Sequence, residues 1–404
     1  NTLVGYFREV QNARVVAYCD PDQERLGAIA KEDARALRTT DMRRVFDSPD
    51  VDAVVIATCN HWHCLAAIWA MQAGKHVYVE KPLGHTQWEG EQVIAAAHRF
   101  RRICQVGTQQ RSNPMQGEIQ QFLHEDKGIG NIEGVRVNRL GVRESIGRRS
   151  APMSPPASVD YDLWLGPAQD VPIRRENFHY DWHWVWNTGS GEMGNWGVHI
   201  LDDVRNNVFR DSIATPSSVI AAGGRFAWDD AGETPNIHFA LLDAGGIPVA
   251  VSLSNVPKPG DLPQPEGPSS GYVVYGSEGQ LHGHRGGAVA YDVSGKPAKR
   301  FQGPGGNPRH QQNFVDAIRQ DDPSLLASPA QVGHDSTAWC NLINIATRLP
   351  SAESAEPTAD ETGKLSNPLA RKAYDEMSRW AGAHASSTFR LGPAGGVDRR
   401  VTSG

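Results

Sequence analysis

The sequence predicts an α/β protein in which a parallel sheet domain is followed by an α+β domain with an open, mostly antiparallel sheet. Three observations predict this. Strands and helices alternate over the first third of the chain. Val51–Ala57 is a continuous apolar run, typical of a strand buried on both faces. Farther along, long alternating strands are separated by loops instead of helices, which indicates an open antiparallel or mixed sheet.

The composition is that of a folded protein and excludes several functional classes. The 404 residues suit two or three domains, with 39% hydrophobic and 21% charged residues. A net charge of −6 argues against a nucleic-acid partner, which needs a basic face. No apolar run approaches the length of a membrane-spanning helix, so we expect no membrane partner. The five cysteines form no CxxC pair and indicate reduced core thiols.

The first third supplies the parallel sheet. Residues 1–9 have the pattern of a helix already under way. We expect strands at 14–19, 51–57, 76–79 and 103–106. We expect helices at 21–30, 41–46, 61–73 and 87–98, with Asp41 capping the second and Gly74 ending the third. Strands joined by such helices make right-handed crossovers and lie parallel.

The second part has its own pattern. We expect strands at 134–140, 217–222, 237–242, 248–253 and 272–276, and covering helices at 309–319 and 329–348. Segments 144–158 and 255–270 are rich in Pro, Gly and Ser and are expected to be loops. The predicted domains are 1–122 and 123–350, followed by a C-terminal wrap and flexible tail at 351–404.

Ligands of parallel α/β sheets sit beyond the carboxyl ends of the strands, where this chain places polar residues. Asp20 follows the first predicted strand. An acid there can accept both ribose hydroxyls of adenosine and repels a 2′-phosphate, which favours NAD over NADP. The alternative is an aspartate that only caps the turn of the DPD sequence.

Glu80-Lys81-Pro82 follows the third predicted strand. A lysine directly after a buried strand has its stem in the core and its ammonium in the cleft, where it can stabilise a developing alkoxide. Pro82 fixes the turn. The alternative is a lysine at the surface.

A glycine-rich cluster lies at 189–202. If residues 192–206 form a helix, Asn195, His199 and Asp202 share one face. A neutral imidazole is the natural base near neutral pH. The alternative is a structural histidine whose ring nitrogens find hydrogen-bond partners in the core.

These motifs together resemble the Gfo/Idh/MocA family of NAD(P)-dependent sugar and polyol oxidoreductases. The resemblance covers about residues 1–350 and rests on several quoted segments. They are VVAYCDPD at 15–22, VVIATCNHWH at 54–63, AGKHVYVEKPL at 73–83, VGTQQRS at 106–112, WLGPA at 164–168, GSGEMGNWGVHILD at 189–202 and VYGSEGQL at 274–281. The resemblance implies a Rossmann-type first domain, a nicotinamide cofactor, and hydride transfer at a sugar or cyclitol carbon.

The resemblance also assigns roles. It implies that Lys81 stabilises the oxyanion and that His199 takes the hydroxyl proton while hydride leaves the same carbon for the nicotinamide. It implies that the residues lining the cofactor, besides Asp20 and Lys81, are Thr58, Asn60, His61, His63, Glu80 and Gln109. We expect no metal, because the histidines of the chain do not have spacings that force one site.

Two features depart from the family pattern. The first strand and the G-x-G-x-x-G loop are absent, apparently lost just before Asn1, so we expect an unpaired central strand and weakened NAD binding. Asn195 stands where many members carry Asp. An amide can orient the His199 ring but adds no charge, so we expect His199 to titrate lower than in such members.

Aromatic and charged residues near these motifs are candidates for substrate binding. We expect Trp182 and His183 to contact the sugar, because sugars stack on aromatic rings, and Asp202 and Arg111 to reach it. The alternative is core packing for the tryptophans (Trp164, Trp182, Trp184, Trp186 and Trp196) and an ion pair for Arg111.

Three functions remain open at this stage. The first is a dehydrogenase, the second a glycosidase-like enzyme that uses transient oxidation by NAD, and the third a non-catalytic binding protein. The family suggests a homodimer or homotetramer formed through the outer face of the second sheet, to which strands at 237–253 are suited. Cysteine usage fits the cytoplasm, while many similar sequences carry a twin-arginine export signal to the periplasm.

Overall fold

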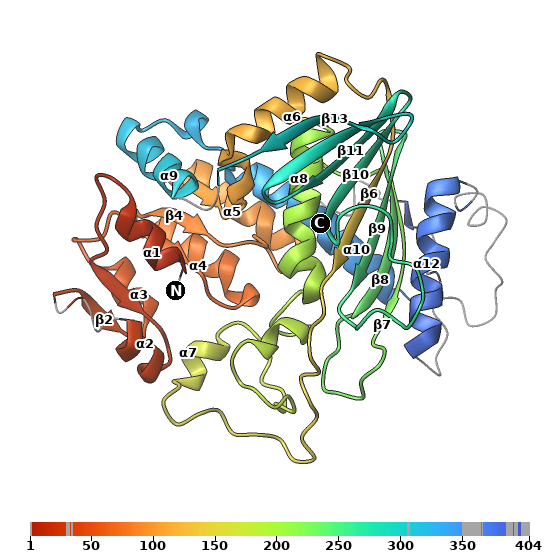
Figure 1. Cartoon of the computed structure of the whole chain (residues 1–404). Coiled ribbons are helices and arrows are strands. Elements are labelled where there is room, and N and C mark those ends of the chain that lie inside the picture. The colour runs from red at the N-terminus through yellow and green to blue at the C-terminus, as the bar shows by residue number, and fades with distance from the viewer. Residues whose placement is uncertain are drawn as a thin grey trace.

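The computed structural model describes residues 2–29, 33, 35–304, 308–349, 365, 367–384, 391 and 395–396. Figure 1 shows the first part of the chain, in red and orange, beside a large sheet whose strands run through green to cyan. The predicted α/β architecture, a parallel domain followed by a mostly antiparallel one, is confirmed.

The first domain alternates strands and helices as predicted. Its strands are β1 (Ala17–Cys19), β2 (Leu37–Thr39), β3 (Ala53–Ile56), β4 (His76–Val79) and β5 (Cys104–Val106). Its helices are α1 (Thr2–Glu9), α2 (Gln23–Ile29), α3 (Met42–Phe46), α4 (Asn60–Gln72) and α5 (Gln87–Phe100). Asp41 caps α3 by accepting the backbone N–H of Arg43. The short strand β2 was not predicted, because its sequence, LRT, has too few apolar residues to show a period.

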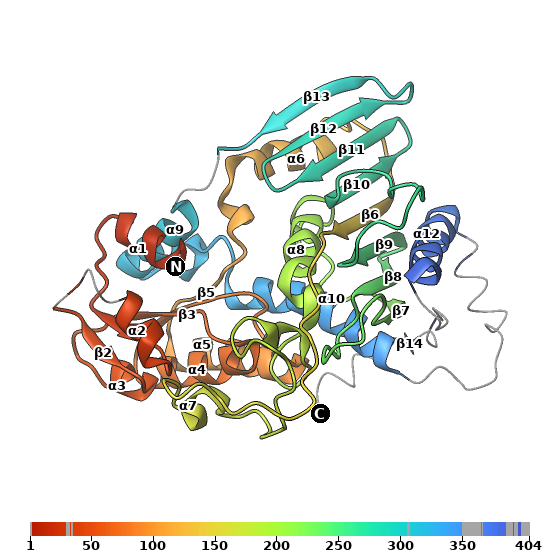
Figure 2. The same cartoon turned by 60° about the horizontal axis from the view of Figure 1, so that its bottom comes forward.

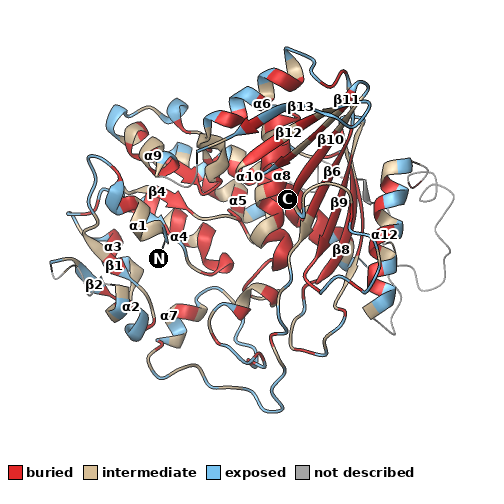
Figure 3. Cartoon of the chain, viewed as in Figure 1, coloured by how far each residue is buried: buried red, intermediate tan, exposed pale blue. Residues whose placement is uncertain are grey.

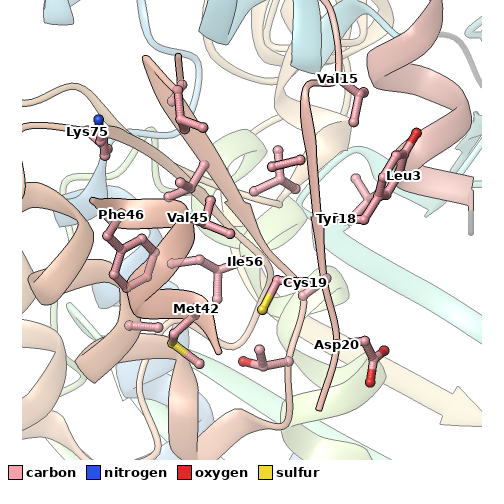
Figure 4. Close-up of a pocket in the computed structure, with 18 of the residues that line it drawn as sticks. Leu3, Val15, Tyr18, Cys19, Asp20, Met42, Val45, Phe46, Ile56 and Lys75 are labelled. Carbon is pink, nitrogen blue, oxygen red and sulfur yellow. The ribbon is translucent and has the colours of Figure 1, made fainter. Parts of the chain in front are cut away.

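The parallel strands form two separate sheets. One contains β1 and β2, and the other has the order β3-β4-β5. A cavity of about 1700 Å³ lies where β1 and β3 face each other. Figure 4 shows Cys19 pointing from β1 toward the apolar side chains of Val45 and Ile56. The expected unpaired strand edge is confirmed, and it leaves Val55 of β3 42% exposed.

The second domain is built on a nine-stranded sheet. The strand order is β13-β12-β11-β10-β6-β9-β8-β7-β14, with β6 and β9 parallel and the other neighbours antiparallel. The strands are β6 (Ile132–Leu140), β7 (Ser218–Gly224), β8 (Ile237–Ala244), β9 (Ile247–Ser254), β10 (Ser270–Gly276), β11 (Gly279–His284), β12 (Gly287–Asp292), β13 (Pro297–Gln302) and β14 (Gly395–Gly396). Strands β11, β12 and β13 were not predicted, because glycine and polar or charged residues interrupt their apolar pattern.

Helices cover both faces of this sheet (Figure 2). The remaining helices are η2 (Gln109–Ser112), α6 (Pro114–His124), α7 (Tyr161–Leu165), η3 (Asp181–Trp184), η4 (Met193–Gly197), α8 (Val198–Asn207), α9 (Arg309–Gln320), η5 (Pro323–Leu325), α10 (Ala330–Arg348) and α12 (Pro368–His384). Residues of α6, α8 and α10 pack with the inner face of the sheet in the largest hydrophobic core. Figure 3 shows the buried central strands between these layers.

Helix α12 occupies the outer face of β8 and β9. Phe239 and Ala250 of these strands share a core with Met377 and Trp380 of α12. A helix of the same chain therefore already covers the outer face of these strands, and the predicted homodimer or homotetramer through this face stays a prediction. Of the predicted wrap and tail at 351–404, most lies outside the described residues, and α12 forms a packed helix within it.

None of the helices in the described ranges combines the length and the apolar character that crossing a membrane requires. Whether the protein resides in the cytoplasm or the periplasm stays a prediction.

A buried ion pair attaches α12 to the sheet. Arg136 of β6 is fully buried and pairs with Glu376 of α12. The Arg136 guanidinium also donates to Asn138 and Ser252. The carboxylate of Glu376 therefore compensates a charge that has no access to water.

We predict that Glu376→Ala lowers the free energy of unfolding by about 3–5 kcal/mol, because it leaves the Arg136 charge buried without its partner. Asp375→Ala, an exposed position on the same helix, should change it by less than about 0.5 kcal/mol. Chemical denaturation measures both variants. Equal effects of the two substitutions would show that the ion pair does not hold α12.

Candidate active site

Polar residues follow each parallel strand at one edge of the first domain. The cavity between β1 and β3 reaches this edge, where its lining includes Asp20, Thr58, Glu80 and Gln109. The other residues expected at the cofactor, Asn60, His61, His63 and Lys81, do not line it. The cavity therefore has an apolar floor between two strand edges and a polar end at the carboxyl termini of the strands.

Lys81 connects the two domains. Its ammonium donates to the backbone carbonyl of Asn195 at 2.8 Å and lies 3.4 Å from the Oδ1 atom of Asn195. Burial lowers the pKa of Lys81, and the neighbouring Glu80 carboxylate opposes this. The close approach needs Gly194, because a Cβ there would lie 2.5 Å from the Ser190 Cβ and 3.2 Å from Pro82.

Two histidines hold the backbone around Lys81. The His63 ring is buried between the carbonyl oxygens of Pro82, at 2.8 Å, and Thr58, at 3.1 Å. The His61 ring lies between the carbonyls of Thr188 and Trp164. Burial lowers the pKa of each histidine to about 4, so each ring is neutral at pH 7 and donates one hydrogen bond. The structure places both rings as supports of the chain beside the cavity.

The segment that carries His199 is not a regular α-helix. Residues Met193–Gly197 form the π-helical turn η4, and only then does α8 begin. The segment is helical as predicted, with a wide first turn, and the shared face of Asn195, His199 and Asp202 stays a prediction. The Asn195 side chain donates to Glu192 at 3.1 Å instead of orienting the His199 ring.

His199 is held neutral by its surroundings. The described residues give its ring nitrogens no hydrogen-bond partner, and its ring centroid lies 5.9 Å from that of Trp196. Burial lowers the pKa of His199 well below 6.5, and the positive charges of Arg285, Lys81 and Arg139 lower it further. The site therefore combines an ammonium with a neutral imidazole.

Glu192 is the carboxylate that binds the neighbouring arginines and Asn195. It is fully buried and accepts from Arg139 at 2.8 Å, from Arg143 at 3.3 Å and from Asn195 at 3.1 Å. The sequence analysis missed this residue and both arginines. The sequence did hold a signal for Glu192, because this acid lies inside the glycine-rich segment already chosen as part of the site. Arg139 and Arg143 are distant in sequence from that segment, so no local motif marks them.

Arg111 and Asp202 bind each other. The Arg111 Nε atom lies 2.8 Å from the Asp202 carboxylate, and its other nitrogens contact Asp211. Asp202 is 1% exposed and also accepts from Ser336. This geometry favours the ion-pair alternative for Arg111, and the expected contact of both residues with substrate stays a prediction.

The aromatic segment lies over the same site. The Trp182 and His183 rings are stacked, with centroids 3.6 Å apart, and Trp182 lines the cavity. Burial lowers the pKa of His183 to about 4, with a smaller contribution from Lys81. Trp164 and Trp184 are buried, as the packing alternative predicted for part of this set. Trp182 and His183 remain candidates for substrate contact.

Asp20 and Glu80 have distinct surroundings at the polar end of the cavity. One carboxylate oxygen of Asp20 accepts the backbone N–H of Asp22 at 2.9 Å, so Asp20 closes its turn and still lines the cavity. Glu80 accepts from Gln109 at 3.0 Å, and burial raises its pKa. A Cβ at residue 107 would lie 2.5 Å from Glu80, so only glycine leaves room for this carboxylate.

Two family models match well over half of the chain. The first, described as an oxidoreductase family with an NAD-binding Rossmann fold, matches residues 3–108. The second, described as the C-terminal alpha/beta domain of the same oxidoreductase family, matches residues 145–368. Both models carry the family designation GFO_IDH_MocA.

Curated relatives match over part of their length. A 4-carboxy-2-hydroxymuconate-6-semialdehyde dehydrogenase from Sphingobium sp. is 27% identical over 169 residues, which cover 41% of this chain and 51% of the relative. Inositol 2-dehydrogenase 2 from Saccharopolyspora erythraea is 33% identical over 168 residues, covering 41% and 46%. The matched stretch therefore spans about half the length of these relatives.

Solved structures share the fold. The WlbA dehydrogenase from Bordetella pertussis, in complex with NADH and UDP-GlcNAcA, superposes with a TM-score of 0.62 at 19% identity. The superposition covers 86% of this chain and 92% of that one. At this identity the likeness concerns the fold alone.

We predict that Lys81→Met raises the pKa of His199, because it removes a positive charge that opposes protonation of the ring. The imidazole resonances of His199 in an NMR titration measure this shift. Lys296→Met, at an exposed turn between β12 and β13, should leave the titration unchanged. An unaltered His199 titration in the Lys81 variant would show that the ammonium does not act on the imidazole.

Proposed function

The chain belongs to the Gfo/Idh/MocA oxidoreductase family, and from this premise we propose that it transfers hydride between NAD and a hydroxyl-bearing carbon of a sugar, polyol or cyclitol. The observation that carries the proposal is the Lys81 ammonium held on the Asn195 carbonyl, four residues before His199, whose imidazole is kept neutral. The names of the relatives agree with it, since they include a dehydrogenase of an inositol.

The residues at the polar end of the cavity fit a dinucleotide. Asp20 offers a carboxylate for ribose hydroxyls and disfavours the 2′-phosphate of NADP. Thr58, Glu80 and Gln109 offer hydroxyl, carboxylate and amide groups along the same edge. When bound, the nicotinamide supplies the hydride acceptor.

His199 and Lys81 have different roles at the substrate hydroxyl. His199 is neutral and accepts the hydroxyl proton at one of its ring nitrogens. Lys81 keeps its positive charge through the nearby Glu80 and Glu192 carboxylates, and its N–H groups stabilise the oxygen as negative charge develops. Asn195 acts on Lys81, because its backbone carbonyl accepts from the ammonium and aims it.

The stacked pair of Trp182 and His183 closes the site on another side. A flat aromatic surface suits the C–H face of a sugar ring and keeps water from the reacting carbon. His183 is close enough to Lys81 for the ammonium to lower its pKa, which supports a place for this pair at the substrate.

We predict that Lys81→Ala lowers turnover by about a hundredfold to a thousandfold, as for the loss of an oxyanion donor, while the affinity for NAD changes less than about threefold. Turnover is followed as NADH formation across sugars, polyols and cyclitols, and NAD affinity by calorimetry. The control is Lys296→Ala, an exposed lysine outside the site. Retained turnover in the Lys81 variant would remove this residue from the mechanism.

The same screen, extended to aryl glycosides, separates the two redox functions. Net accumulation of NADH is expected for the dehydrogenase. Release of the aglycone without net NADH would contradict it and would indicate glycoside cleavage by transient oxidation.

A further inference from the structure

Arg285 belongs to the nine-stranded sheet of the second domain and contacts the first domain. It lies in the two-residue turn between β11 and β12, and its Nη2 atom donates to the Gln109 Oε1 atom of the first domain at 3.4 Å. Its guanidinium carbon lies 5.9 Å from the ring centroid of Trp196. The His199 ring centroid lies at the same distance from that indole, so Trp196 is a neighbour of both side chains.

No carboxylate of the described residues pairs directly with the Arg285 guanidinium, and Gln109 stands between it and Glu80. Its Nη1 atom is buried, and the described residues give it no hydrogen-bond partner. Among the same residues, no carboxylate comes within 4.0 Å of this side chain, although fifteen ion pairs of that kind are formed elsewhere. A buried donor left without an acceptor destabilises a protein, so this arrangement needs a reason.

The other cations of the site each bind an acceptor directly. Arg139 and Arg143 both bind the Glu192 carboxylate, and Lys81 binds the Asn195 carbonyl. Two acids act on Arg285 without a direct contact, Glu80 and Asp203, and burial raises the pKa of Glu80 and raises that of Asp203 to about 7. At neutral pH the Asp203 carboxyl is therefore only partly charged.

We propose that Arg285 binds a carboxylate of the substrate, so that the substrate class is a sugar acid such as a uronate or an aldonate. The proposal rests on the proposed function for the reaction, whereas the binding can be measured without turnover. A single guanidinium presents parallel N–H donors that match the two oxygens of a carboxylate. A phosphate dianion would call for a second free cation, and Arg139 and Arg143 are held by Glu192.

A carboxylate at this place would also assist the base. Arg285 is, after burial, the first of the charges that oppose protonation of His199. An anion bound to the guanidinium offsets this charge, so that the imidazole can take the hydroxyl proton at a lower cost in free energy. Binding and proton transfer would then be linked through one side chain.

The test compares acids with their own neutral derivatives. D-glucuronate, D-galacturonate, D-gluconate and D-galactonate are each paired with the methyl ester, which has the same stereochemistry without the charge. Calorimetry in saturating NAD measures binding to the wild-type protein, to Arg285→Gln and Arg285→Lys, and to Arg300→Gln, an exposed arginine on β13. Thermal unfolding confirms that each variant is folded.

We expect at least one acid to bind about tenfold to a hundredfold more tightly than its ester, the range for a hydrogen bond to a charged group. Arg285→Gln should abolish this preference, Arg285→Lys should retain part of it, and Arg300→Gln should keep all of it. The proposal is overturned if no acid is preferred, if the preference survives in Arg285→Gln, or if that variant loses NAD affinity instead.

The two proposals fail in different ways. If neutral sugars are oxidised and the carboxylate adds nothing, the redox function stands and the role of Arg285 falls. If acids are preferred through Arg285 but no compound reduces NAD, the carboxylate site stands and the redox function falls.

Discussion

The hydrogen bond from the Lys81 ammonium to the Asn195 carbonyl is the contact on which the site depends. It joins the end of a parallel strand in the first domain to the π-helical turn of the second. Gly194 permits the approach because no side chain separates this turn from Pro82. The position of the ammonium on the turn that precedes His199 is therefore set by backbone packing, which is stiffer than a contact between two long side chains.

The electrostatics of the site follow from burial. Lys81, Arg139 and Arg285 all act on the His199 imidazole, and the buried Glu192 carboxylate pairs with Arg139 and Arg143. This surplus of positive charge keeps His199 neutral and favours an anion. The site is thus prepared both to stabilise an oxyanion and to attract a negatively charged ligand, and the two properties share a physical origin.

The first domain is less regular than the second. Between β1 and β3 the parallel sheet is interrupted by a cavity whose floor is apolar and whose end is polar. The polar end, with Asp20 and Glu80, is the part whose chemistry suits a cofactor.

The sequence by itself determined the two-part α/β architecture, most strands and helices of the first domain, and the candidate groups Lys81 and His199, because hydrophobic periodicity and local motifs are properties of neighbouring residues. It could not determine which distant residues meet them. Glu192, Arg139 and Arg285 join the site through three separate elements, and the π-turn that redirects Asn195 depends on packing against Pro82. Likewise, the side chains of Arg111 and Asp202 are suited to binding a substrate. In the folded chain they form an ion pair with each other. The sequence does not show this, because the interaction of two charges depends on their distance in space.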